Sequence, residues 1–140
     1  MKFGTEEWVK AFCKAVNENQ NFREAGGPEG VPPDGWEGDF LFIVEPSGNL
    51  DHEIKMFVGL YHGECTGARV LKEGEEVETA FVYSGLYDAW VQLLKQELDP
   101  IRGLLAGKFK LKGDMAKILK ATRAAQELVV SSTMIDTELY

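Results

Sequence analysis

His62, Gly63, Glu64 and Cys65 form the segment of this 140-residue chain that comes closest to nucleophilic chemistry. A cysteine thiol becomes a nucleophile when a nearby base takes its proton, and His62 is close to Cys65 in sequence. Neighbouring positions in a strand or turn often point apart, however, and no third group that would orient the histidine is evident. We therefore expect a turn followed by a buried cysteine and no catalytic residues, with an enzyme that uses Cys65 as a remaining alternative.

Metal and phosphate sites have little support in the sequence. His52 and His62 are the only histidines, whereas a catalytic zinc takes about three protein ligands. The two cysteines, Cys13 and Cys65, have no C-x-x-C spacing, and we expect Cys13 to be a small core residue. The glycine-rich segment 26–30 lacks the spacing of a phosphate-binding loop. We expect neither a metal nor a cofactor.

The size and charge of the chain limit its possible partners. A chain of 140 residues can form one domain, 1–140, with a core that needs no disulfides or metals. A net charge of −8 argues against nucleic acid and against constitutive docking on anionic membranes, although residues 108–123 are basic and leave a weak contact open. Stable membrane insertion is not expected, because no apolar run could span a bilayer. Without the apolar region of a signal peptide, a cytoplasmic location is expected.

The first half of the chain predicts one helix, a loop and four strands. Thr5 can cap a helix whose apolar residues recur at helical spacing: Trp8, Phe12, Ala15 and Val16. This pattern ends near residues 17–21, and the Gly- and Pro-rich segment 25–38 is expected to be a loop. The apolar run 40–44 and the alternating run 53–62 predict a hairpin, with weaker strands over 66–71 and 78–83.

The second half predicts helices around one further strand. A helix runs from about 86 to 98, and Asp99-Pro100 can start a short helix over 101–105. In the next segment Lys108, Lys110 and Lys112 alternate with apolar residues, which predicts a half-buried edge strand. Gly113 and Asp114 then introduce a long amphipathic helix, and residues 130–140 form a tail with no predicted structure. The fold class is α+β with a mainly antiparallel sheet.

The segment Gly107-Lys108-Phe109-Lys110-Leu111-Lys112-Gly113-Asp114-Met115 resembles a signature of the sterol carrier protein 2 (SCP-2) lipid-transfer family. That signature reads Gly-Lys-apolar-Lys-apolar-x-Gly-Asn/Asp-Met. Residues 81–85 and 87–90 resemble the strand and helix that precede it. The helix containing Trp8 and the segment 61–65 resemble the stand-alone prokaryotic branch of the family.

The resemblance implies a mixed sheet of about five strands with helices packed on one face around a hydrophobic tunnel. It implies noncatalytic binding or transfer of a fatty acid, fatty acyl-CoA, sterol-like molecule or phospholipid, and enzymes of lipid metabolism are expected partners. Ala106 stands where animal members often carry glutamine, so sterol specificity is not carried over. The ligand-binding residues that it implies are Phe42, Met56, Phe81, Trp90, Leu94, Leu104, Leu105, Phe109, Met115 and Leu119.

The sequence leaves open whether these apolar residues surround a hollow space. A close-packed core would use the same residue types, and helical or strand periodicity does not distinguish the two. The alternative function is therefore an accessory or protein-interaction module that keeps the fold without a ligand. An occluded cavity and an exposed apolar patch near residues 25–36 would favour that alternative.

Overall fold

A computed structural model describes all 140 residues of the chain, which form a five-stranded mixed sheet with six helices. The strands are β1 (Phe40–Glu45), β2 (Ile54–Tyr61), β3 (Glu64–Val70), β4 (Phe81–Leu86) and β5 (Phe109–Lys112). Their order in the sheet is β3-β2-β1-β4-β5. The central strands β1 and β4 are parallel, and the other three pairs are antiparallel. The predicted α+β class and mainly antiparallel sheet are confirmed.

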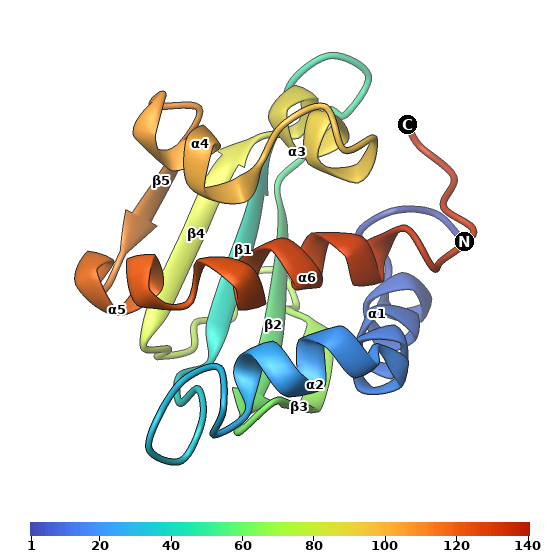
Figure 1. Cartoon of the computed structure of the whole chain (residues 1–140). Coiled ribbons are helices and arrows are strands. Elements are labelled where there is room, and N and C mark those ends of the chain that lie inside the picture. Colours follow the sequence, from blue (N-terminus) through green and yellow to red (C-terminus); the bar gives the residue numbers. More distant parts are fainter.

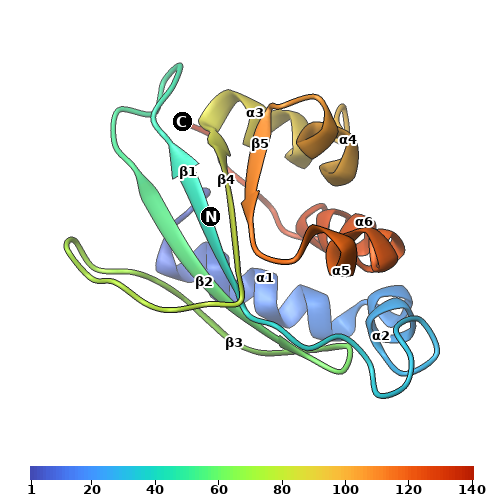
Figure 2. The ribbon, with the colours of Figure 1, turned by 90° about the vertical axis from the view of Figure 1, so that its left-hand side faces the viewer.

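The helices gather on one face of this sheet (Figures 1 and 2). They are α1 (Glu6–Glu18), α2 (Gln20–Gly26), α3 (Tyr87–Leu94), α4 (Pro100–Leu105), α5 (Met115–Lys120) and α6 (Thr122–Ser132). Figure 1 shows α6 crossing in front of the strands, with α3 and α4 on one side of it and α1 and α2 on the other. The apolar stripes of these helices thus meet the same face of the sheet. None of the helices is both long enough and apolar enough to cross a membrane.

Polar side chains at the helix starts fix where three of these helices begin. The hydroxyl of Thr5 accepts a hydrogen bond from the backbone N–H of Trp8 at 3.2 Å. The carboxylate of Asp99 accepts from two backbone N–H groups of α4, and Asp114 accepts from the N–H of Lys117. Such caps satisfy backbone donors that have no partner within the helix. All three starts follow the sequence prediction.

Two sequence predictions about helices are wrong. Residues 20–26 form α2 rather than a fading end and a loop, because the Asn19 side chain accepts hydrogen bonds from the N–H groups of Asn21 and Phe22 and starts a new helix. The long helix after Asp114 is broken at Ala121, whose φ of −111° and ψ of 30° lie outside the helical range. The apolar stripe continues across this break from α5 into α6, which explains why periodicity did not reveal it.

The bounds predicted for the fourth strand, residues 78–83, are also displaced from those of β4. β4 begins at Phe81 rather than near residue 78, and it continues to Leu86. Its pairing with β1 explains these limits, because Phe40 lies opposite Phe81 and Glu45 lies opposite Leu86. The predicted hairpin of β1 and β2 and the predicted edge strand β5 are confirmed.

The two ends of the chain lie side by side (Figure 1). Lys2 and Glu138 form a short parallel bridge, and the N–H of Phe3 donates to the carbonyl of Glu138 at 2.9 Å. The indole N–H of Trp8 donates to the hydroxyl of Thr137 at 2.9 Å. The segment after α6, which had no predicted structure, therefore holds Phe3 and Trp8 against the core.

Candidate functional site

An apolar cavity of about 90 Å³ lies between the sheet and the helices, and 18 of its 20 lining residues are hydrophobic. The β-strands contribute one side of it, and α1, α3, α4, α5 and α6 contribute the remainder. The lining residues are Phe3, Trp8, Val9, Phe12, Phe40, Phe42, Met56, Val58, Tyr83, Trp90, Leu93, Leu94, Pro100, Ile101, Leu104, Ile118, Ala125, Leu128, Val129 and Ser132.

The register of the sheet brings its lining side chains into one row. Phe42 lies opposite Met56 on β2 and opposite Tyr83 on β4, and Phe40 lies opposite Val58. Cross-strand partners point to the same face of a sheet, so these side chains all face the helices. Because side chains alternate between the two faces of each strand, the sheet gives the cavity one continuous apolar side.

The polar atoms that reach this cavity already have protein partners. The hydroxyl of Tyr83 donates to the carbonyl of Pro100 at 2.9 Å, and the indole N–H of Trp90 donates to the carbonyl of Ile43 at 3.0 Å. Ser132 donates to the carbonyl of Val129. Burial raises the pKa of Tyr83 well above its usual range, which keeps the phenol neutral. A molecule in the cavity would therefore meet apolar contacts rather than free donors or acceptors.

Replacing Tyr83 with phenylalanine is expected to lower stability without weakening the binding of an apolar ligand. The variant removes the hydroxyl that donates to the Pro100 carbonyl, and the loss of a hydrogen bond of this kind costs about 0.5–1.5 kcal/mol. The ring itself, and so the cavity lining, is unchanged. Denaturant unfolding measures the first effect and titration with a fluorescent fatty acid the second. A large loss of binding at unchanged stability would contradict this role for Tyr83.

The structure brings together half of the ligand-binding residues that the resemblance implied. Phe42, Met56, Trp90, Leu94 and Leu104 line the cavity. The remaining five do not line it. Phe81 and Phe109 are buried elsewhere in the core, whereas Leu105, Met115 and Leu119 are exposed to solvent.

Close packing against the backbone explains why Phe109 lies outside the cavity. Its ring occupies the space beside Gly85 of β4 and Gly103 of α4, where an added Cβ would approach the ring to 2.6 Å and 2.9 Å. It also stacks on Tyr83 and packs perpendicular to the ring of Trp90. Phe109 therefore packs against two residues of the cavity lining, Tyr83 and Trp90, without lining the cavity itself.

Sequence reasoning missed the contributions of α1 and α6 to the cavity. Trp8, Val9 and Phe12 line it from α1, and Ala125, Leu128 and Val129 line it from α6. The sequence did indicate that these helix faces point inward, because most of these residues belong to the apolar stripes of the predicted helices. Periodicity showed that the stripes face inward, but it did not show which of their residues border an unfilled space.

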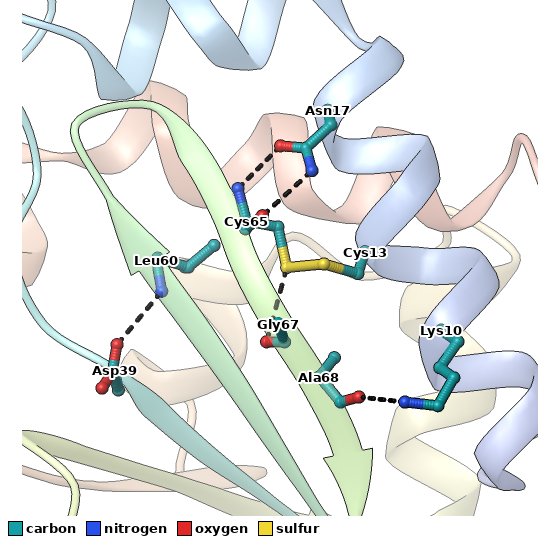
Figure 3. The surroundings of a disulfide bond; sticks show 8 residues. All are labelled: Lys10, Cys13, Asn17, Asp39, Leu60, Cys65, Gly67 and Ala68. Atoms are coloured by element: carbon teal, nitrogen blue, oxygen red, sulfur yellow. Dashed lines mark hydrogen bonds between the residues drawn. A yellow bond between two sulfur atoms is a disulfide. The ribbon is translucent and has the colours of Figure 1, made fainter.

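Cys13 and Cys65 form a disulfide between α1 and β3, with their Cα atoms 5.4 Å apart (Figure 3). Cys65 is buried, as the sequence predicted, but the pairing of the two cysteines was not predicted. Asn17 of α1 also links this helix to β3. Its side chain accepts a hydrogen bond from the Cys65 N–H at 2.8 Å and donates one to the Cys65 carbonyl at 2.9 Å. With both sulfur atoms bonded, no free thiol exists to act as the nucleophile of the Cys65 alternative.

The two histidines each pair with a nearby carboxylate. Nδ1 of His52 lies 3.0 Å from Asp51, and Nε2 of His62 lies 2.9 Å from Glu37. No group of three or more His, Cys, Asp and Glu residues is arranged to hold a metal ion. Of the spaces in the fold, the apolar cavity is therefore the candidate functional site.

Comparison with solved structures places this fold in the class of sterol carrier proteins. A crystal structure of sterol carrier protein 2 matches with a TM-score of 0.81 at 29% identity, covering 96% of this chain and 99% of the other. The solution structure of a conserved hypothetical protein from Thermus thermophilus, described as possibly a sterol carrier protein, matches with a TM-score of 0.83 at 29% identity, covering 99% and 92%.

The sequence itself matches the SCP-2 sterol transfer family over residues 36–126. The chain belongs to this family. A more distant fold match is the palmitated form of an SCP-2-like protein from Aedes aegypti, with a TM-score of 0.53 at 14% identity, covering 84% of this chain and 93% of the other. A comparison with curated proteins gives no match.

Proposed function

We propose that residues 1–140 act as one noncatalytic domain that binds and transfers a single hydrophobic ligand, such as a fatty acid, fatty acyl-CoA, phospholipid or sterol-like molecule. The observation that carries the proposal is the apolar cavity between sheet and helices, whose buried polar side-chain atoms all have hydrogen-bond partners within the protein. Transfer of an alkyl chain from water into such a space gains about 0.8 kcal/mol for each buried CH₂ group. Membership of a lipid-carrier family supports the same function.

The size of the cavity adds a condition to this proposal. Pockets that enclose a drug-sized ligand measure on the order of 300–1,000 Å³, several times the 90 Å³ found here. A complete acyl chain therefore requires the helices to move outward when the ligand enters. The short helices α4 and α5, with six residues each, form part of the lining and have the least internal support.

The ligand-free accessory module has less support. Its expected apolar patch near residues 25–36 is not found, because Ala25 and Trp36 are buried and the exposed large apolar side chains lie elsewhere. A cytoplasmic location and partner enzymes of lipid metabolism stay predictions from the sequence.

Displacement of a fluorescent fatty acid tests the proposed function. Unlabelled palmitate, a phospholipid and a sterol are added in turn to the protein saturated with the probe. We expect saturable probe binding and displacement by at least one of these ligands. Absence of saturable binding by any acyl or sterol probe would contradict the proposal.

A further inference from the structure

Positive charge is concentrated on one edge of this acidic protein. Residues 102–123 contain seven Lys and Arg residues and one Asp, a net charge of +6, whereas the remainder of the chain carries −14. These residues belong mainly to α4, β5 and α5. The two views agree that α4, β5 and α5 run along one edge of the molecule (Figures 1 and 2).

The cations of this edge lack acidic partners within the protein. Of the eight Lys and Arg residues outside 102–123, six form ion pairs with Asp or Glu side chains, such as the close pair of Arg69 and Glu75. None of the seven within 102–123 does so. Lys117 is engaged with the carbonyl of Glu37 and the ring of Trp36, and Lys108 donates to the amide oxygen of Gln92. The positive charge of the edge is therefore free to attract an anionic partner.

Large apolar side chains are exposed on the same elements. Leu105 at the end of α4 is 73% exposed, and Met115 and Leu119 on α5 are 39% and 45% exposed. We name this surface the α4–β5–α5 edge. It comprises Arg102, Leu105, Lys108, Lys110, Lys112, Met115, Leu119, Lys120 and Arg123. Interleaved cations and exposed aliphatic side chains are the composition of segments that lie on a membrane surface.

The α4–β5–α5 edge is also only one helix away from the cavity. Leu104 lines the cavity while its neighbour Leu105 is exposed, and Ile118 lines the cavity while Leu119 is exposed. The same two short helices thus border the cavity on one side and present the exposed leucines on the other. A displacement of α4 or α5 would connect the cavity to whatever covers this edge.

We propose that the α4–β5–α5 edge docks reversibly on the surface of an anionic phospholipid bilayer, where the ligand enters and leaves the cavity. A soluble phosphate would neutralise the cations but would leave Leu105 and Leu119 in water, whereas a bilayer surface accommodates both. The acidic remainder of the chain is repelled by the same surface, which orients the protein. The exchange of ligand rests on the proposed function, but the docking does not require a ligand in the cavity.

Vesicle flotation with ligand-free protein tests the docking. The vesicles contain phosphatidylcholine alone or phosphatidylcholine mixed with phosphatidylserine. The test variant combines Lys108→Gln, Lys110→Gln and Lys112→Gln; its control, Lys14→Gln with Lys72→Gln and Lys95→Gln, removes the same charge from other exposed positions. A second variant, Leu105→Ser with Leu119→Ser, removes apolar surface and keeps the charge.

We expect wild type to float with the anionic vesicles only, and less so as salt is raised. Each cation near such a surface contributes roughly a fivefold factor, so the test variant should bind on the order of 100-fold more weakly, and the control should bind nearly as wild type. The leucine variant should also bind more weakly. Failure of wild type to float, or equal loss in the test and control variants, would overturn the proposal. Fatty-acid binding is measured separately and should survive in all three variants, so that docking and ligand binding can fail independently.

Discussion

Replacing Ala125 with phenylalanine is expected to abolish binding of a fatty-acid probe while the protein stays folded. Ala125 lies on α6, is half-buried and lines the cavity, so a ring at this position would occupy the space that a ligand needs. Overpacking of this kind costs about 1–3 kcal/mol of stability, and loss of ligand contacts should weaken binding by at least about tenfold. Titration with the fluorescent probe measures the affinity.

Ala116→Phe provides the matched control for this prediction. Ala116 is exposed on α5, so the substitution makes the same change of side chain in a helix without reaching the cavity. Its equilibrium affinity for the probe should be close to that of wild type in a solution without membranes. Equal affinity in the Ala125 and Ala116 variants would show that the ligand does not occupy the cavity.

Removing the disulfide is expected to cause the largest loss of stability of any change considered for this protein. The bond joins residues 52 positions apart, and closing a loop of that length restricts the unfolded chain by about 4 kcal/mol in the chain-entropy account. The variant Cys13→Ala with Cys65→Ala should lower the free energy of unfolding by about this amount. Urea denaturation of the variant and of wild type provides the measurement.

A reducing agent supplies an independent form of the same experiment. Reduced wild type and the double alanine variant should unfold at similar urea concentrations, both well below oxidised wild type. Asn17 still bridges α1 and β3 through two hydrogen bonds, so the native fold should persist in the absence of denaturant. Indistinguishable unfolding curves for oxidised wild type, reduced wild type and the variant would contradict the prediction.

Local patterns predicted most of the secondary structure because their physical causes are local. Thr5, Asp99 and Asp114 cap helices through their own side chains, and strand alternation follows from the two faces of a sheet. The predictions of helix boundaries failed at residues that end one helix and start the next. Asn19 both ends α1 and starts α2, and Ala121 interrupts a helix without changing the apolar repeat.

The disulfide and the cavity could not be derived from local patterns. Cys13 and Cys65 meet because α1 packs on β3, a contact between distant parts of the chain. Leu104 and Leu105 are the same residue type in neighbouring positions, yet one lines the cavity and the other is exposed. Only the tertiary arrangement distinguishes an unfilled space from a packed core, and the family resemblance supplied the expectation that such a space exists.

Native mass spectrometry of the protein with added palmitate tests most directly whether the cavity binds one lipid. At increasing palmitate concentration we expect a single bound ligand per chain that saturates in wild type and in Ala116→Phe, and little bound ligand in Ala125→Phe. That outcome would locate one lipid in the cavity lined by α6. Ligand numbers that rise without saturation, equally in all three proteins, would contradict a lipid-binding cavity.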